Sequence, residues 1–97
     1  MAKEGWEPMK YLLFYDYIEG VVERRTPLRE GHLGIAQRYF ERGELLLAGA
    51  FNDPIDGAVL VFNDRESAEA FAREDPYVLN GLVTSQRIRE WNVVVGG

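Results

Sequence analysis

The chain has 97 residues, 46% of them hydrophobic and 28% charged, which is typical of one globular domain. Its 16 acidic residues outnumber its 11 lysines and arginines, and the net charge of -5 argues against nucleic acid as a partner, because binding phosphates requires a basic surface. The absence of cysteine excludes disulfides, thiolate chemistry and cysteine-ligated metal centres.

The N-terminal segment shows no export signal. Residues 1–8 are polar and lack the apolar segment of a signal peptide, and no apolar stretch approaches the roughly 20 residues that span a bilayer. We therefore expect a cytoplasmic protein with no membrane partner. Its expected organisation is a flexible leader over 1–8 and a single domain over 9–97.

The first part of the domain predicts a strand and then a helix. Residues 10–17, KYLLFYDY, are rich in aromatic and branched side chains and predict a strand, followed by a loop over 19–27. Over 28–42 the apolar residues recur at helical spacing, and His32 lies among them. Thr26 followed by proline is a suitable start for this helix, with Thr26 as the N-cap.

The second part predicts a hairpin, a helix and a last strand. Strands are expected over 44–51 and 57–63, on either side of the turn-forming sequence NDPID. Asp64 is a suitable cap for a helix over 65–74, whose apolar side continues onto Asp75 before Pro76 ends the segment. The last strand is expected over 83–95.

This βαββαβ order is the ferredoxin-like α+β arrangement, an antiparallel sheet with both helices on one face. The strands of such a sheet should alternate apolar and polar residues, because the other face meets water. The sequences YLLFY, LLLAGAF and AVLVF are instead nearly continuous apolar runs. Because two helices cover only one face, we expect a second copy of the chain to cover the other, which makes a homodimer.

His32 and Asp75 are the candidate catalytic residues. A lone imidazole acts as a general base or acid when a carboxylate orients it. A buried Asp75 would need a cation nearby, and His32 or Arg29 could supply it. Spacing alone leaves a structural interpretation open for each: an imidazole bound to backbone carbonyls, and a turn carboxylate bound to its own backbone.

Four further residues are candidate substrate-binding positions. Arg29 lies one turn before His32 and could bind an anion, although a solvated surface position stays open. Tyr77 could donate a phenolic hydrogen bond or simply pack. Tyr15 would line the core or a cavity, and Gly49 within a strand is typical of a bulge or a close backbone approach. A zinc site on one histidine and one aspartate would need symmetry partners or water, and no nucleotide-binding motif is present, so we expect no metal or other cofactor.

The order of motifs resembles the YciI-like protein family over residues 9–95. The motifs that carry the resemblance are Arg29-x-x-His32-Leu33, Ala48-Gly49, Asp56-Gly57 and Asp75-Pro76-Tyr77. The resemblance implies a dimeric α+β barrel of ferredoxin-like subunits, related in fold to muconolactone isomerases. It also implies a cavity lined by a histidine and an aspartate, which correspond to His32 and Asp75, with Arg29 matching an accompanying arginine. The family usually has proline after the strand glycine, where this chain has Ala50.

Three functions follow as hypotheses. Characterised relatives in the family include a dehydrochlorinase in which such a dyad moves protons, so the first hypothesis is a cofactor-independent acid–base enzyme of the lyase or isomerase type. Its substrate would be a small aromatic or anionic molecule. The second is a dimer that binds a small ligand without transforming it. The third is a structural or accessory dimer in which the two residues only hold the fold together.

Overall fold

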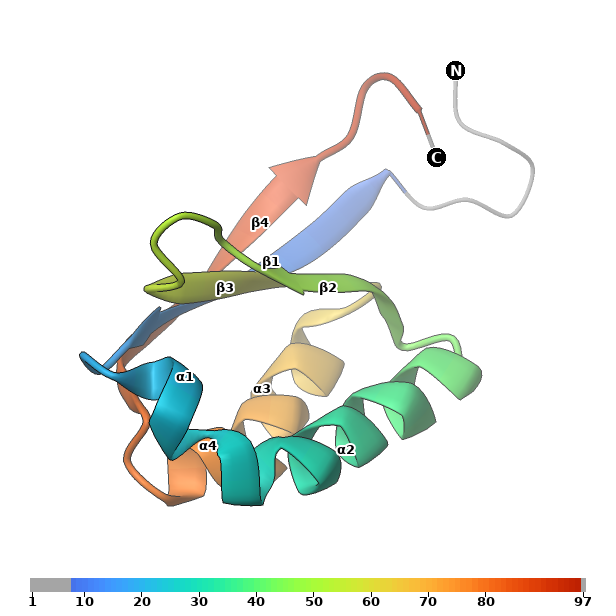
Figure 1. Cartoon of the computed structure of the whole chain (residues 1–97). Coiled ribbons are helices and arrows are strands. Elements are labelled where there is room, and N and C mark those ends of the chain that lie inside the picture. The colour runs from blue at the N-terminus through green and yellow to red at the C-terminus, as the bar shows by residue number, and fades with distance from the viewer. Residues whose placement is uncertain (1–7, 97) are drawn as a thin grey trace.

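The computed structural model describes residues 8–96, which form a four-stranded antiparallel sheet with all the helices on one side (Figure 1). The strands are β1 (Met9–Tyr17), β2 (Leu45–Ala50), β3 (Gly57–Phe62) and β4 (Val83–Asn92), in the order β2-β3-β1-β4. The helices are α1 (Val21–Arg24), the 3-10 turn η1 (Thr26–Leu28), α2 (Arg29–Glu41), α3 (Arg65–Glu74) and α4 (Pro76–Leu79). This arrangement confirms the predicted ferredoxin-like α+β fold.

Several predicted boundaries are wrong. The segment 19–27, predicted as a loop, contains α1 and most of η1. Thr26 does not cap α2, because the chain is already wound into η1 and leaves no extended residue before the helix; its hydroxyl donates to the Val22 carbonyl instead. The last strand ends at Asn92, where its pairing with the first residue of β1 ends. Of the predicted leader, residues 1–7 lie outside the described residues.

The core lies between the sheet and the helices. Leu13 and Tyr15 of β1 alternate onto the helix side and join Leu60 and Phe62 of β3, all at most 2% exposed. Phe71 of α3 packs into this layer and is fully buried. α2 and α3 lie side by side on this face, so their inner residues can meet across the gap (Figure 1).

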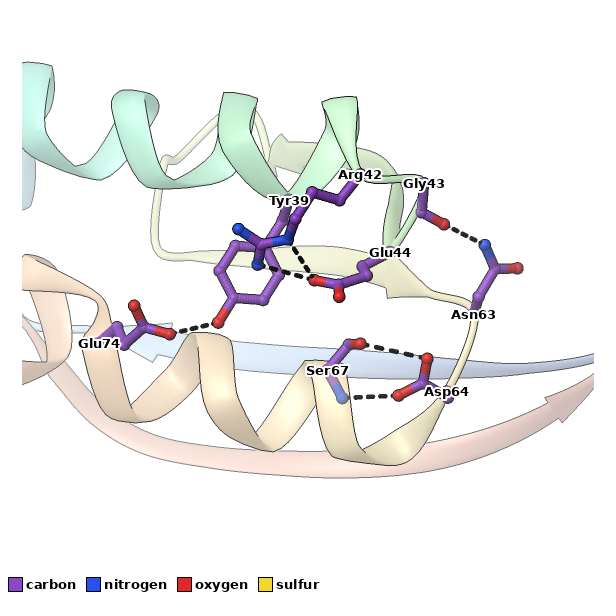
Figure 2. Close-up of polar contacts among 8 residues, drawn as sticks. All are labelled: Tyr39, Arg42, Gly43, Glu44, Asn63, Asp64, Ser67 and Glu74. Carbon is purple, nitrogen blue, oxygen red and sulfur yellow. Dashed lines mark hydrogen bonds and ion pairs between the residues drawn. The ribbon is translucent and has the colours of Figure 1, made fainter.

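One end of the helix layer is fastened by paired polar side chains (Figure 2). The Tyr39 hydroxyl donates to Glu74 of α3, and the Arg42 guanidinium lies 4.4 Å above the Tyr39 ring while pairing with Glu44 at 2.8 Å. Asp64 caps α3 as predicted, accepting a hydrogen bond from the backbone N–H three residues on at 2.7 Å. These contacts tie the end of α2 to α3 and to the start of β2.

In the described part of the chain no helix covers the other face of the sheet (Figure 1), and several apolar side chains lie on it. Phe14 and Val59 pair across β1 and β3 there and are half-buried, and Arg87 lies 4.7 Å above the Phe14 ring. Leu47 is 71% exposed and Trp91 46% exposed. This face therefore carries apolar side chains together with charged ones such as Arg87 and Arg89. None of the helices within 8–96 has the length and apolar character to cross a membrane.

Candidate functional site

Asp75 occupies the junction between α3 and α4. Its extended backbone, with φ -66° and ψ 120°, ends α3, as a residue before proline tends to do. The sequence predicts that Pro76 ends the helical segment, and this is wrong. Pro76 begins α4 instead, because proline fits the first helical position. Asp75 is the N-cap of that short helix, and its Oδ1 accepts a hydrogen bond from the Tyr77 backbone N–H at 3.0 Å.

The same carboxylate contacts His32 of α2. His32 Nδ1 lies 2.8 Å from Asp75 Oδ1, the aspartate is fully buried, and the histidine side chain is 13% exposed. The imidazole also stacks on the Tyr77 ring, with centroids 3.9 Å apart and planes 5° from parallel. The structure thus brings the two candidate catalytic residues into contact and holds the imidazole from two directions.

These contacts define which imidazole nitrogen is available. Beside an ionised carboxylate, Nδ1 of a neutral imidazole carries the hydrogen and donates it to Asp75. Nε2 then carries the lone pair, and no hydrogen bond engages it within residues 8–96. His32 also lines a cavity, and Nε2 is the polar atom of its side chain that Asp75 does not engage.

Tyr15 supports Asp75 from the sheet. Its hydroxyl donates to Asp75 Oδ2 at 2.9 Å, so the buried carboxylate accepts hydrogen bonds from three groups. Burial raises the pKa of Tyr15, and the charge of Asp75 raises it further, which keeps the phenol neutral and able to donate. Tyr15, a candidate substrate-binding residue, is not among the described residues that line the cavity. Its hydroxyl binds Asp75 instead.

The cavity next to His32 has a volume of about 190 Å³. Its polar lining comes from five side chains, and small or aliphatic residues of α2, β2 and β3 make up the rest. The five are Tyr17, Arg25, Arg29, His32 and Tyr77. Since an engineered apolar cavity of about 150 Å³ binds benzene, this volume suits a compound with a single ring.

Two guanidiniums act on two phenols in this lining. Burial raises the pKa of Tyr17 to about 12 and the charge of Asp75 adds to the rise, while Arg25 and Arg29 oppose it. Burial also raises the pKa of Tyr77, again against the effect of Arg29 and Arg25. The Tyr77 hydroxyl is buried and makes no hydrogen bond of normal geometry within 8–96, but it interacts with the Arg29 side chain, which lowers the Tyr77 pKa as a hydrogen-bond donor as well as through its charge. The positive charge of both arginines therefore reaches the phenols beside the imidazole.

Sequence reasoning identifies Arg29 and Tyr77 and misses Arg25 and Tyr17. The sequence predicts a loop at Arg25, whereas α1 and η1 wind that segment and bring Arg25 to the cavity. The signal for Tyr17 is available in the sequence, because it lies two residues after Tyr15 and strand alternation places both on the helix side.

The prediction for the backbone at Gly49 is wrong. Gly49 pairs regularly with Val59, the irregularity of β2 lies between Leu45 and Leu47, and a Cβ at Gly49 would meet no atom within 4 Å. The close approach occurs instead at Gly57, where a Cβ would lie 2.6 Å from a backbone oxygen. Gly49 does line the cavity, as does Ala50, which stands where the resemblance places proline. Nowhere in the described part of the chain do three histidine, cysteine or acidic side chains gather as metal ligands.

Comparison with known proteins relates the chain to one family. The sequence model of the YCII-related domain matches residues 9–92. The protein YciI of Escherichia coli O6:H1 is 29% identical in an alignment that covers 89% of this chain and 99% of that protein. The protein YciI of Shigella flexneri matches equally.

Two solved structures share the fold. One is the 5-chloro-2-hydroxyhydroquinone dehydrochlorinase of Burkholderia phenoliruptrix AC1100 in complex with 2,5-dihydroxybenzoquinone. It is similar with a TM-score of 0.69 at 16% identity, over 84% of this chain and 92% of that chain. The other is an antibiotic biosynthesis monooxygenase, with a TM-score of 0.55 at 13% identity, over 90% of this chain and 99% of that chain.

Proposed function

The chain belongs to the YCII-related domain family, and from that premise we propose that it is a cofactor-independent acid–base enzyme of the lyase or isomerase type. Its substrate is a small molecule with a single ring. The observation that carries the proposal is the 2.8 Å contact between His32 Nδ1 and a fully buried Asp75 beside a cavity of about 190 Å³. The similarity in fold to a dehydrochlorinase of a hydroxyhydroquinone is in keeping with it.

In the proposed reaction, His32 moves a proton and Asp75 supports it. The Nε2 lone pair removes a proton from an acidic C–H or O–H of the substrate, and the imidazolium that forms is stabilised by the adjacent carboxylate. The same proton then returns to another atom of the substrate, which gives isomerisation, or goes to a leaving group, which gives elimination. Stacking on Tyr77 keeps the imidazole in one orientation during both transfers.

We also propose that the protein is a homodimer in which the apolar sheet face of one copy covers that of the other. Leu47 and Trp91 on this face are 71% and 46% exposed, and two half-buried residues, Phe14 and Val59, lie between their strands. Burying these side chains against an identical face would remove apolar surface from water on both copies.

Proton exchange tests the proposed chemistry without knowledge of the natural substrate. A panel of hydroxyquinols, including 5-chloro-2-hydroxyhydroquinone, and five-membered lactones is incubated in D₂O, and exchange of acidic C–H protons is followed by NMR. The wild type should accelerate exchange of at least one compound, and His32→Gln should lose about 10²–10⁴-fold of that rate. The matched control is Arg38→Gln, which introduces the same side chain on the exposed side of α2 and should keep the full rate.

The result also distinguishes the alternatives. A wild type that exchanges no compound faster than buffer overturns the enzymatic proposal, as does a His32→Gln variant with the wild-type rate. The competing function is a dimer that binds ligand without transforming it, and the two guanidiniums that line the cavity without an ion pair inside residues 8–96 favour it. Binding of a panel member without any exchange would establish that function instead.

A further inference from the structure

The cavity contains two cationic side chains that form no ion pair with an acidic group in the described part of the chain. In a chain with 16 acidic residues, Arg25 and Arg29 both line the cavity, yet neither forms an ion pair within residues 8–96. Arg25 is half-buried, which makes an unpaired charge there more costly than on an open surface. The charge that would balance these guanidiniums is therefore absent from the described part of the protein.

The Tyr77 hydroxyl is a second unmet group at the same place. The residue is 1% exposed, and its hydroxyl makes no hydrogen bond of normal geometry within 8–96, although it interacts with the Arg29 side chain. A buried hydroxyl almost always has a partner, because leaving it unpaired is unfavourable. Since Tyr77 lines the cavity with Arg25 and Arg29, a molecule in the cavity is the partner that could satisfy all three groups.

We propose that Arg25 and Arg29 bind the carboxylate or another oxyanion of a single-ring acid, with the Tyr77 hydroxyl as a third donor. Guanidinium groups match the planar arrangement of a carboxylate and hold it through charge-assisted hydrogen bonds. The cavity volume leaves room for one ring beside that anion. This inference rests on the proposed function, to which it adds the substrate class and a binding residue, Arg25.

The position of the arginines relates the anion to the imidazole. Arg29 precedes His32 by three residues on α2, and residues with this spacing lie on the same side of a helix. An anion held by Arg29 therefore anchors the substrate beside Nε2, and the ring extends over the small residues Ala48 and Gly49 of β2. Arg25, from the end of α1, approaches the same cavity from a different element, so the anion meets donors from two directions.

Benzoate and benzamide test the inference because they have nearly the same shape and differ by one charge. Calorimetric titration should show benzoate binding to the wild type at least about tenfold more tightly than benzamide. Arg25→Gln should weaken benzoate binding by about tenfold and leave benzamide unchanged. Arg24→Gln removes the same charge from the neighbouring exposed residue, which does not line the cavity, and should bind both compounds like the wild type.

The chain has a single histidine, so the ring protons of His32 report occupancy of this cavity directly by NMR. Equal affinity for benzoate and benzamide overturns the inference, and so does an Arg25→Gln variant that behaves like Arg24→Gln. Inorganic phosphate is the third probe; if it binds as tightly as benzoate, a ring is not recognised and the single-ring class is wrong.

Failure of this inference can be told apart from failure of the proposed function. If His32→Gln retains the preference for benzoate while the wild type exchanges no proton, the anion site exists and only the catalytic proposal is wrong. If the wild type exchanges protons through His32 but does not distinguish benzoate from benzamide, the catalytic proposal holds and the assignment of Arg25 and Arg29 is wrong.

Discussion

Removing the hydroxyl of Tyr15 tests how Asp75 is held in place. Tyr15→Phe keeps the buried ring but removes the 2.9 Å hydrogen bond to Oδ2, whereas both other donors bind Oδ1. The substitution thus leaves one oxygen of a fully buried carboxylate without a donor in the described structure. Hydrogen bonds to charged groups contribute about 1.5–3 kcal/mol, so the free energy of unfolding should fall by about 2 kcal/mol. For a domain of this size, the Tm should fall by roughly 8–16 °C.

Tyr11→Phe is the matched control for this experiment. Tyr11 lies on the same side of β1, four residues earlier, and its hydroxyl has no hydrogen bond within 8–96. Urea unfolding of Tyr11→Phe should give a free energy within about 0.5 kcal/mol of the wild type. Equal stabilities for Tyr15→Phe and Tyr11→Phe would refute the reasoning. In an Asp75→Asn background the cost of Tyr15→Phe should shrink, because the charged acceptor is gone.

Two further predictions concern packing and assembly. Gly57→Ala should lower the free energy of unfolding by about 1–3 kcal/mol, because the added Cβ would lie 2.6 Å from the Tyr15 backbone oxygen. The control is Gly49→Ala, whose Cβ would meet no atom within 4 Å and which should leave that free energy unchanged in the same urea titration. Leu47→Glu should halve the mass measured by sedimentation equilibrium, since a charge would lie in the proposed dimer interface. The control is Leu79→Glu, which should leave the mass unchanged because Leu79 is on the helix side, where it is 68% exposed. A monomeric wild type would contradict the dimer.

The order of elements was predictable because each element has a strong local signal. Residues 10–17 read as a strand, 28–42 as a helix and Asp64 as a cap, and each agrees with the structure to within one or two residues. The weaker assignments were those that depend on neighbours. The segment 19–27 is short and charged, so nothing in its own pattern distinguishes a loop from the short turns of helix that pack there. The end of β4 depends on where β1 begins.

Some of the residues that line the cavity were predictable from the sequence, and their arrangement was less so. Helical spacing places His32 on the inner side of its helix, but the 2.8 Å contact with Asp75 depends on how α2 and α3 lie on the sheet. Tyr15 was expected to line the core or a cavity, and nothing in its strand pattern shows that its hydroxyl reaches Asp75. Arg25 could not be found from sequence, because its place in the cavity depends on the winding of α1 and η1.

The contacts that the two sequence interpretations of Asp75 require are both present in the structure. As a turn carboxylate it caps α4 through the Tyr77 N–H, and as a partner of His32 it contacts the imidazole through the same oxygen. The cap fixes where that oxygen lies, so the residue that caps α4 also positions the imidazole. A substitution at Asp75 would therefore disturb the helix junction and the imidazole together, and loss of activity in such a variant would not identify its cause. His32→Gln separates the two roles, because it removes the imidazole while Tyr15 and the Tyr77 N–H still hold the carboxylate.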